Sequence, residues 1–284
     1  MYKLVLSCVF TILAMTASFV QAETSTTSKP FEIGVVPYLS ARSLIANYEP
    51  MRLFLEHALG KPVKIYTATG FKAFFLNAQR GDFDMVITGA NFGRLLQKEH
   101  QFTPLLRFSK SASSWLVTAL NSPVKTLQEL HGKVIAIPDQ LSMAVIVSMA
   151  NLRENGMEPV TDFHLLKVSS FPSAILSVQK GEAAAAITAT GAMTQMPKEL
   201  SESVRVLLDS GEFTNPIILT HPRIDKNTNS LLTDALLKLS AASNINGEFI
   251  ANLGFGPLIP VTTKDMSGLD RYLPETKRIL NETP

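Results

Sequence analysis

The fold is decided by residues 31–98, which read FEIGVVPYLSARSLIANYEPMRLFLEHALGKPVKIYTATGFKAFFLNAQRGDFDMVITGANFGRLLQK. Short apolar runs alternate here with stretches whose apolar residues recur at helical spacing, and glycine or proline stands between them. Such alternation predicts βαβ units and a mainly parallel sheet. The expected strands are 31–36, 63–66 and 83–88, and the expected helices are 47–59, 70–80 and 91–98.

A second series of the same kind follows. Strands are expected at 133–137, 163–168 and 183–188, with helices at 142–155 and 173–180. We therefore expect a second α/β lobe at about 119–213, with 31–118 and 214–284 forming the first. The predicted fold class is α/β with two lobes, each a mainly parallel sheet with flanking helices.

The chain begins with the features of a secretory signal peptide. Lys3 precedes an almost wholly apolar run at 4–20, and Ala22 ends a small-residue cleavage site. A membrane anchor is the alternative, but it needs about 20 apolar residues. Cleavage after residue 22 would remove Cys8, the one cysteine, and leave a flexible leader at 23–30 in a periplasmic protein. Disulfides and cysteine chemistry are then excluded.

Composition and motifs argue against several other classes of protein. The 284 residues are 46% hydrophobic with a net charge of +2, which excludes disorder and does not suggest a nucleic-acid partner. The sequence contains neither GxSxG nor a phosphate-binding GxxxxGK[ST] loop, and its five histidines are scattered. Asp82 and Asp84 fit a turn and a strand entry better than a carboxylate pair. We therefore expect no enzyme activity, no metal and no cofactor.

The chain resembles the periplasmic solute-binding components of phosphate, phosphite and phosphonate ABC transporters. The similarity runs from about residue 31 to 253 and is carried by blocks in the family's order: GVVPYLSARSLIANYEPMRLFLEHALGKPV, GDFDMVITGANF, TLQELHGKVIAIPDQLSMA, NLRENGMEPVTDFHLLKV and SAILSVQKGEAAAAI. The resemblance implies the two-lobed fold of type II periplasmic binding proteins. It also implies a hinge of two crossover strands, at about 115–120 and 214–221, and a ligand held in the cleft between the lobes.

Ligands of open α/β sheets lie beyond the carboxyl ends of strands, which here directs attention to 37–40, 88–91 and 138–144. The last of these segments opens a helix whose free N–H groups would suit an anion, and Ser142 fits either a helix cap or a ligand donor. The candidate ligand-binding residues are Tyr38, Ser40, Thr88, Gly89, Asn91, Ser114, Leu141, Ser142, Met143, Ala144 and Phe171.

Three positions depart from the pattern that the resemblance implies for phosphonate binders. Met143, Phe171 and Ala184 stand where that pattern has a hydroxyl, a histidine and an aspartate. We therefore expect a pocket poor in donors and weak or absent binding of 2-aminoethylphosphonate. The expected partners of a monomeric chain are a small oxyanion and either an ABC permease or a membrane-bound sensor, such as a sensor kinase or a cyclic-dinucleotide enzyme. An enzyme built on this fold is a third, weaker alternative.

Overall fold

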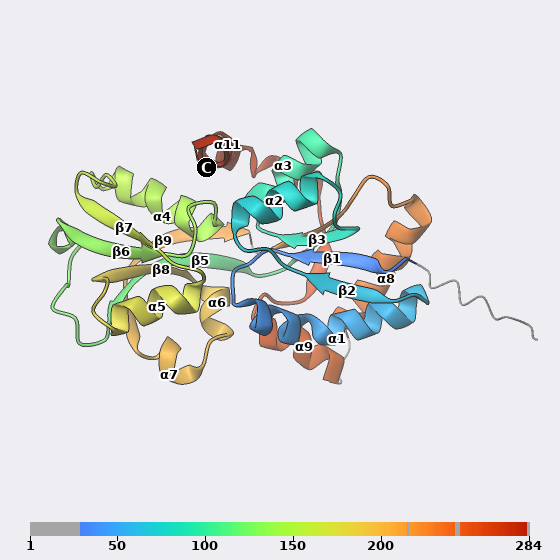
Figure 1. Ribbon diagram of the computed structural model, residues 1–284, viewed down its shortest axis with the longest axis horizontal. Helices are drawn as coiled ribbons and strands as arrows, with labels where there is room; N and C mark the ends of the chain where they lie inside the picture. The colour runs from blue at the N-terminus through green and yellow to red at the C-terminus, as the bar shows by residue number, and fades with distance from the viewer. Residues whose placement is uncertain (1–28, 215, 242–244, 283–284) are drawn as a thin grey trace, which may run out of the picture.

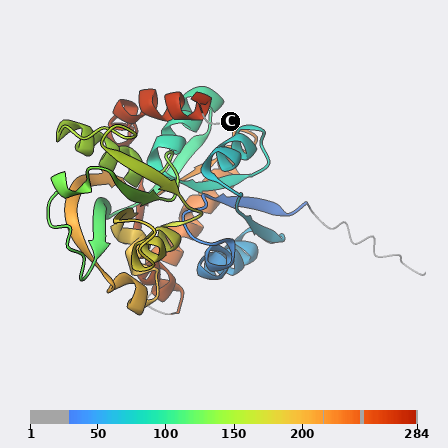
Figure 2. The same ribbon diagram turned by 60° about the vertical axis from the view of Figure 1, so that its left-hand side comes forward.

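The computed structural model describes residues 29–214, 216–241 and 245–282. They form two sheets side by side, each covered by helices (Figures 1 and 2). We call the unit built on the six-stranded sheet lobe 1 and the unit built on the five-stranded sheet lobe 2. The predicted signal peptide, 1–22, lies outside the described residues, and so does the predicted leader, 23–30, except for its last two residues. No helix in the described part is both long and apolar enough to cross a membrane.

Lobe 1 is formed by both ends of the chain, and its sheet has the order β11-β4-β10-β3-β1-β2. Its N-terminal elements are β1 (Phe31–Val35), α1 (Ala41–Leu59), β2 (Val63–Tyr66), α2 (Phe71–Gln79), β3 (Met85–Thr88), α3 (Ala90–His100) and β4 (Thr103–Phe108). Its C-terminal elements are β10 (Ile217–Thr220), α8 (Lys226–Ala241), α9 (Ile245–Leu253), β11 (Leu258–Pro260), α10 (Thr263–Ser267), η2 (Asp270–Tyr272) and α11 (Leu273–Glu282).

Lobe 2 is continuous in sequence, and its sheet has the order β7-β6-β8-β5-β9. Its elements are β5 (Ser111–Ala119), η1 (Gln128–Leu130), β6 (Lys133–Ile137), α4 (Met143–Glu154), β7 (Phe163–Lys167), α5 (Phe171–Gln179), β8 (Ala185–Ala189), α6 (Thr190–Thr194), α7 (Lys198–Ser201) and β9 (Val204–Thr214). Helix α4 packs against β5, β8 and β9 of this sheet and is buried over most of its length.

The two sheets are mixed, and most strands of each run in one direction, as predicted: β1 to β4 in lobe 1 and β6 to β9 in lobe 2. The parallel pairs are β1 with β2 and β3, and β6 with β7 and β8, as the βαβ pattern predicts. The strands that connect the lobes run the other way: β10 is antiparallel to β3 and β4, and β5 is antiparallel to β8 and β9. Strands β5 and β10 each enter their sheet directly from the other lobe, without a connecting helix. No βαβ connection therefore makes them parallel to their neighbours.

The first crossover lies earlier than the expected 115–120. The chain leaves lobe 1 after β4, a strand that the sequence analysis did not identify, and enters lobe 2 with β5. Pro104 and exposed Thr103 weaken the strand pattern of β4. The second crossover joins β9 to β10 and falls within the expected 214–221.

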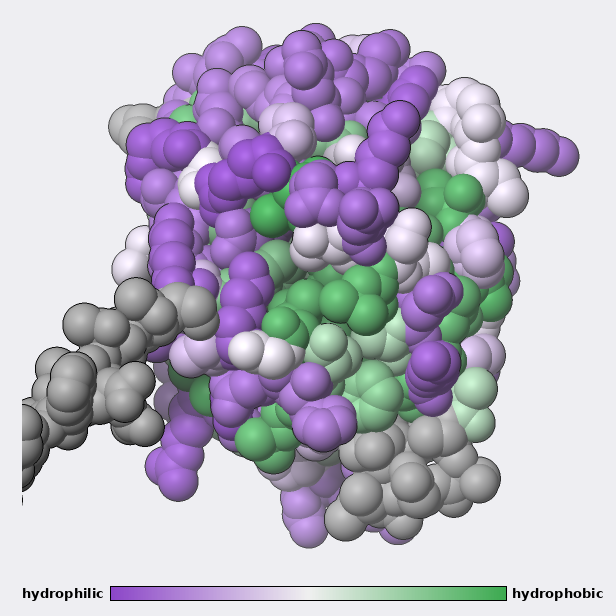
Figure 3. All heavy atoms as spheres, turned by 90° about the vertical axis from the view of Figure 1, so that its right-hand side faces the viewer, coloured by the Kyte–Doolittle hydropathy of each residue, from purple (hydrophilic) through white to green (hydrophobic). Residues whose placement is uncertain are grey.

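The C-terminal segment runs along α3 on one edge of the molecule and reaches lobe 2 (Figures 1 and 2). Asp270 receives two hydrogen bonds from Arg94, at 2.8 and 3.0 Å, and Lys277 pairs with Glu99. These contacts hold the segment to lobe 1. The end of lobe 1 that faces away from lobe 2 shows a hydrophobic area at its centre, bounded by hydrophilic side chains (Figure 3).

Asp84 is a structural ion-pair residue. Its buried carboxylate accepts hydrogen bonds from the backbone N–H of Glu32 and from Arg223 Nε, both at 2.8 Å, so it joins β1, the start of β3 and the loop after β10. Asp82 instead forms an exposed pair with Arg80. The two aspartates therefore do not act together as a carboxylate pair.

We expect Asp84→Asn to lower the free energy of unfolding by about 1.5–3 kcal/mol, because it removes charge-assisted hydrogen bonds to a buried group. Asp82→Asn is the matched control, and removal of its exposed pair should cost less than about 1 kcal/mol. Urea unfolding of both variants measures the difference. Equal effects of the two substitutions would contradict the role given to Asp84.

Candidate functional site

The candidate site lies between the lobes, where loops at the carboxyl ends of their parallel strands meet. The loop after β1 ends at Ser40, which is exposed and caps α1 by accepting a hydrogen bond from Ser43 N at 3.2 Å. The loop after β6 ends at Ser142, which is buried and makes no side-chain cap hydrogen bond with α4. The Ser142 hydroxyl is therefore available to a ligand, whereas that of Ser40 serves the fold.

These loops enclose a cavity of about 60 Å³ at the seam between the lobes. Both lobes and the second crossover contribute to its wall. The lining residues are Val36, Tyr38, Phe71, Gly89, Ser142, Met143, Ala144, Phe171, Ala189, Gly191, Ala192, Phe213, Thr214, Pro216 and Phe255. Over its described residues, the lining contains no Lys, Arg, His, Asp or Glu.

Six of the eleven residues predicted for the site line the cavity: Tyr38, Gly89, Ser142, Met143, Ala144 and Phe171. The others do not. Ser40 is exposed, and Thr88 is buried inside β3. Leu141 is buried beside the cavity, and Asn91 and Ser114 are buried behind it.

Asn91 and Ser114 support the loop and first turn of α4 that line the cavity. Asn91 Nδ2 donates to the carbonyl oxygen of Leu141 at 3.0 Å and so ties lobe 1 to the loop before α4. Ser114 Oγ donates to the carbonyl oxygen of Ala144 at 2.6 Å and bonds Ser148 Oγ at 2.7 Å. Both side chains hold the wall without contacting the space inside it.

Ala184 lies away from the cavity. It precedes β8 and donates its backbone N–H to Val134 O, whereas Ala189, at the other end of the strand, lines the cavity. The absence of an aspartate at this position therefore does not shape the cavity. Met143 and Phe171, the other two departures, do line it.

Gln195, which the sequence analysis missed, joins the lobes next to the cavity. Its Oε1 accepts hydrogen bonds from Tyr38 Oη at 2.9 Å and from Asn47 Nδ2 at 3.0 Å, both in lobe 1. Its Nε2 donates to Gly191 O within lobe 2 and to Leu253 O in lobe 1, both at 3.0 Å. Both acceptor sites of Gln195 Oε1 are thus used by hydrogen bonds that cross the seam.

Tyr38 is held as a neutral phenol at this seam. Burial raises its pKa well above the ordinary value, while hydrogen bonds to Tyr48 and Gln195 act in the opposite direction. Burial also raises the pKa of Tyr48, which lies 3.3 Å from Tyr38 Oη. The Tyr38 hydroxyl therefore donates to Gln195, and its ring faces the cavity.

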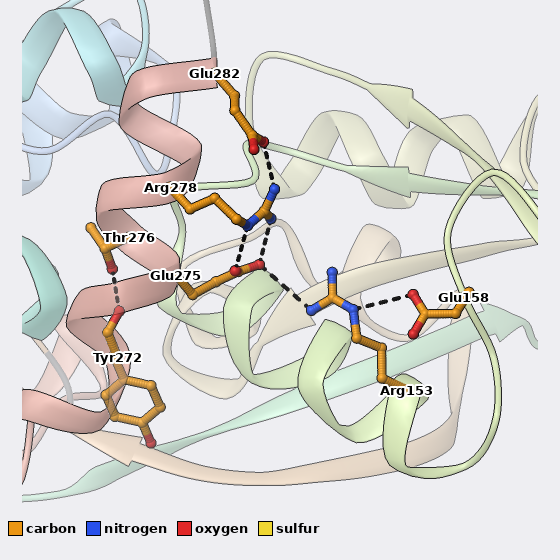
Figure 4. A network of polar contacts seen from close by, with 7 residues as sticks. All are labelled: Arg153, Glu158, Tyr272, Glu275, Thr276, Arg278 and Glu282. Carbon is orange, nitrogen blue, oxygen red and sulfur yellow. Dashed lines mark hydrogen bonds and ion pairs between the residues drawn. The ribbon is translucent and has the colours of Figure 1, made fainter.

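A second set of contacts closes the seam on its other side (Figure 4). Arg153 of α4 lies 3.5 Å from Glu275 of α11 and also contacts Glu158 within lobe 2. Glu275 accepts two further hydrogen bonds from Arg278, and this guanidinium, more than Arg153, lowers the pKa of the Glu275 carboxyl. The lobes are therefore joined by polar contacts on both sides of the cavity.

A polar cavity of about 180 Å³ adjoins the site and shares Phe71 with it. Asp139 lines this polar cavity and accepts a hydrogen bond from Leu141 N at 2.8 Å. Burial raises the pKa of Asp139, and the backbone N–H groups of Leu141 and Phe71 and the charge of Lys167 partly offset that rise. The carboxylate from lobe 2 thus faces the first N–H group of α2 in lobe 1.

The described residues contain no group of three or more His, Cys, Asp or Glu side chains placed to hold a metal ion. The cavity itself offers one hydroxyl on Ser142, one on Thr214 and backbone groups, with aromatic rings around them. Such an arrangement can bind and enclose a small molecule.

A sequence model of the ABC transporter phosphonate, periplasmic substrate-binding protein family matches residues 33–266, most of the chain. The chain belongs to this family of solute-binding proteins. No curated protein sequence matches it significantly.

Solved structures show the same type II periplasmic binding protein fold. PhnD1 from Prochlorococcus marinus, in complex with methylphosphonate, has a TM-score of 0.77 at 17% identity over 89% of this chain and 99% of that one. A binding protein component of an ABC phosphonate transporter from Pseudomonas aeruginosa has a TM-score of 0.77 at 15% identity, covering 90% of each chain. The aliphatic sulphonate binding protein SsuA from Escherichia coli has a TM-score of 0.61 at 15% identity, covering 89% of each.

We expect Gly191→Ala to open the cleft. A Cβ on Gly191 of lobe 2 would overlap the ring of Phe255 in lobe 1, and such overpacking costs about 1–3 kcal/mol. The closed arrangement should lose population, and small-angle scattering should give a larger radius of gyration than for the native chain.

Phe255→Leu in the same chain is the control, because the smaller side chain leaves room for the added methyl group. The double variant should regain the native radius. A Gly191→Ala protein that stays as compact as the native one would show that the two lobes do not meet at this contact.

Proposed function

We propose that this chain binds a small solute between lobes 1 and 2 and delivers it, as a monomer, to the permease of an ABC importer. The observation that carries the proposal is the cavity enclosed at the seam, with Gln195 and Arg153 joining the lobes on either side of it. Membership in a family of periplasmic substrate-binding proteins supports the same role. Capture would use closure of the lobes about the two crossovers.

A phosphonate-like oxyanion is the ligand that the sequence pattern suggests. The donors within reach of it would be the Ser142 hydroxyl, the N–H groups of residues 141–144 and those of the turn at 88–91, with no cationic side chain in the described lining. We expect 2-aminoethylphosphonate to bind weakly or not at all, since each missing charge-assisted hydrogen bond costs about 1.5–3 kcal/mol.

A sensory role is the second candidate function, and the apolar lining of the cavity is the observation that supports it. A protein that has lost the donors for its family's anions could report a different solute to a membrane-bound kinase or cyclic-dinucleotide enzyme. Both roles use the same closure, so only the membrane partner separates them.

In-cell photocrosslinking tests the proposal. A photoreactive amino acid at Ile45 of α1 or Leu176 of α5, both exposed, should capture a transmembrane permease subunit. The control position is exposed Val160, in the loop before β7 at the far end of that strand from the cleft, and it should capture no permease. Capture of a sensor kinase or cyclic-dinucleotide enzyme in place of a permease would overturn delivery to an importer and support the sensory role.

We also propose that export removes residues 1–22. The positive n-region, the apolar run and the small residues before Glu23 motivate this expectation. Intact-mass measurement of periplasmic protein should give a chain that starts at Glu23. A mass that includes residues 1–22, or a lipid on Cys8, would contradict it.

A further inference from the structure

We propose that the cavity selects a small uncharged solute rather than an oxyanion, and that Asp139 contributes to this selection. The inference rests on the proposed function and names the class of solute that the protein would carry. Four features of the site lead to it: the walls, the donors, the neighbouring charge and the size.

The walls are apolar and come from both lobes. Phe71 and Phe255 of lobe 1 face the cavity together with Met143, Phe171 and Phe213 of lobe 2. All five side chains are at least nine-tenths buried, so closure leaves little water around a bound molecule. An ion that loses its water must find partners of opposite charge or several strong donors. The described lining supplies no such cation.

Several donors that could bind an oxyanion already form hydrogen bonds within the protein. The Tyr38 hydroxyl donates to Gln195. The first N–H of α5, on Phe171, points to the carbonyl oxygen of Tyr38 across the seam at 3.5 Å, and Ser170 caps the same helix through Ser173 N. The first N–H of α2 faces the Asp139 carboxylate.

The starts of α3, α4 and α6 lack a side-chain cap hydrogen bond, and they border the cavity through Gly89, Ser142 and Ala189. Ser142 makes no cap hydrogen bond, and Met143 and Ala144 of the first turn line the cavity. The hydroxyls of Ser142 and Thr214 and the N–H groups at these helix starts suit the oxygen of a neutral polar group, such as a carbonyl, sulfoxide or sulfone. Without a cationic side chain in the described lining, they do not replace the water that a phosphonate dianion loses on entry.

A carboxylate, that of Asp139, lines the polar cavity next to this site. This polar cavity shares Phe71 with the site, and the Asp139 carboxylate accepts a hydrogen bond from the first N–H group of α2, that of Phe71. Lys167 lines the same polar cavity as Asp139 and partly balances it. When it is ionised, the Asp139 carboxylate disfavours a second anion at the seam and has no such effect on a neutral molecule.

The cavity is also small. Its volume of about 60 Å³ is less than half of the ~150 Å³ of a cavity that holds benzene. The closed protein therefore fits a compact solute of a few non-hydrogen atoms with methyl groups against the rings and one oxygen toward Ser142.

Three tetrahedral molecules with five non-hydrogen atoms test the inference: dimethyl sulfone, which is neutral, methanesulfonate, and methylphosphonate. Isothermal titration of the full processed chain should show dimethyl sulfone binding at least about tenfold more tightly than methanesulfonate, with methylphosphonate weaker still. Tighter binding of either anion than of the sulfone would overturn the inference and leave the proposed solute-binding function intact. Failure of all three to bind would overturn the inference as well, while photocrosslinking would still judge the proposed function.

Two variants test the residues. Ser142→Ala should weaken the sulfone by about two- to tenfold, the range expected for one neutral hydrogen bond. Asp139→Asn removes the neighbouring charge with little change in shape, so it should narrow the preference for sulfone over methylphosphonate. Asp82→Asn, an exposed site in lobe 1, is the matched control and should leave both affinities unchanged. An unaltered preference in Asp139→Asn would remove Asp139 from the selection.

Discussion

The closure of the two lobes on each other is the constraint on which the candidate site depends. Gln195 reaches from lobe 2 to three partners in lobe 1, and each hydrogen bond contributes about 0.5–1.5 kcal/mol. The ring of Phe255 lies against Gly191, where a side chain would collide with it. The cavity exists only while these contacts hold, because neither lobe encloses it alone.

The two lobes repeat one plan, and the repeat explains why the cavity is walled by similar parts. Positions 71–88 and 171–188 match at a spacing of 100, with the same residue at 71 and 171, 76 and 176, 79 and 179, 81 and 181, 87 and 187, and 88 and 188. Both segments run from a helix into a strand, and Phe71 and Phe171 each begin their helix after an extended residue. The repeat also pairs Asp84 with Ala184. Asp84 forms an ion pair with Arg223, which indicates that this position serves the fold rather than the ligand.

Much of the fold could be predicted from the sequence, and part of the site. The alternation of apolar strands and helices predicted both sets of parallel strands, and the loops after them contain Gly89, Ser142 and Met143, which line the cavity. The sequence of β4 has no periodic hydrophobic pattern. No such pattern indicates that the connecting strands run antiparallel either. Gln195 comes from the end of a short helix, Phe213 from the end of β9, and Phe255 from a turn. Each is a lone residue whose role depends on the other lobe, so no spacing along the chain could reveal it.

The distance between the lobes in the absence of an anion tests the account most directly. Spin labels on cysteines introduced at exposed Leu53 of α1 and Leu176 of α5 report it by pulsed electron resonance, after unfolding and refolding have removed bound solutes. The account predicts that a substantial fraction of molecules shows the short distance in buffer free of phosphate and sulfate, because hydrogen bonds between protein groups hold the lobes together. Added phosphate or methylphosphonate should leave this fraction unchanged. A long-distance population that shortens only when an oxyanion is added would contradict it.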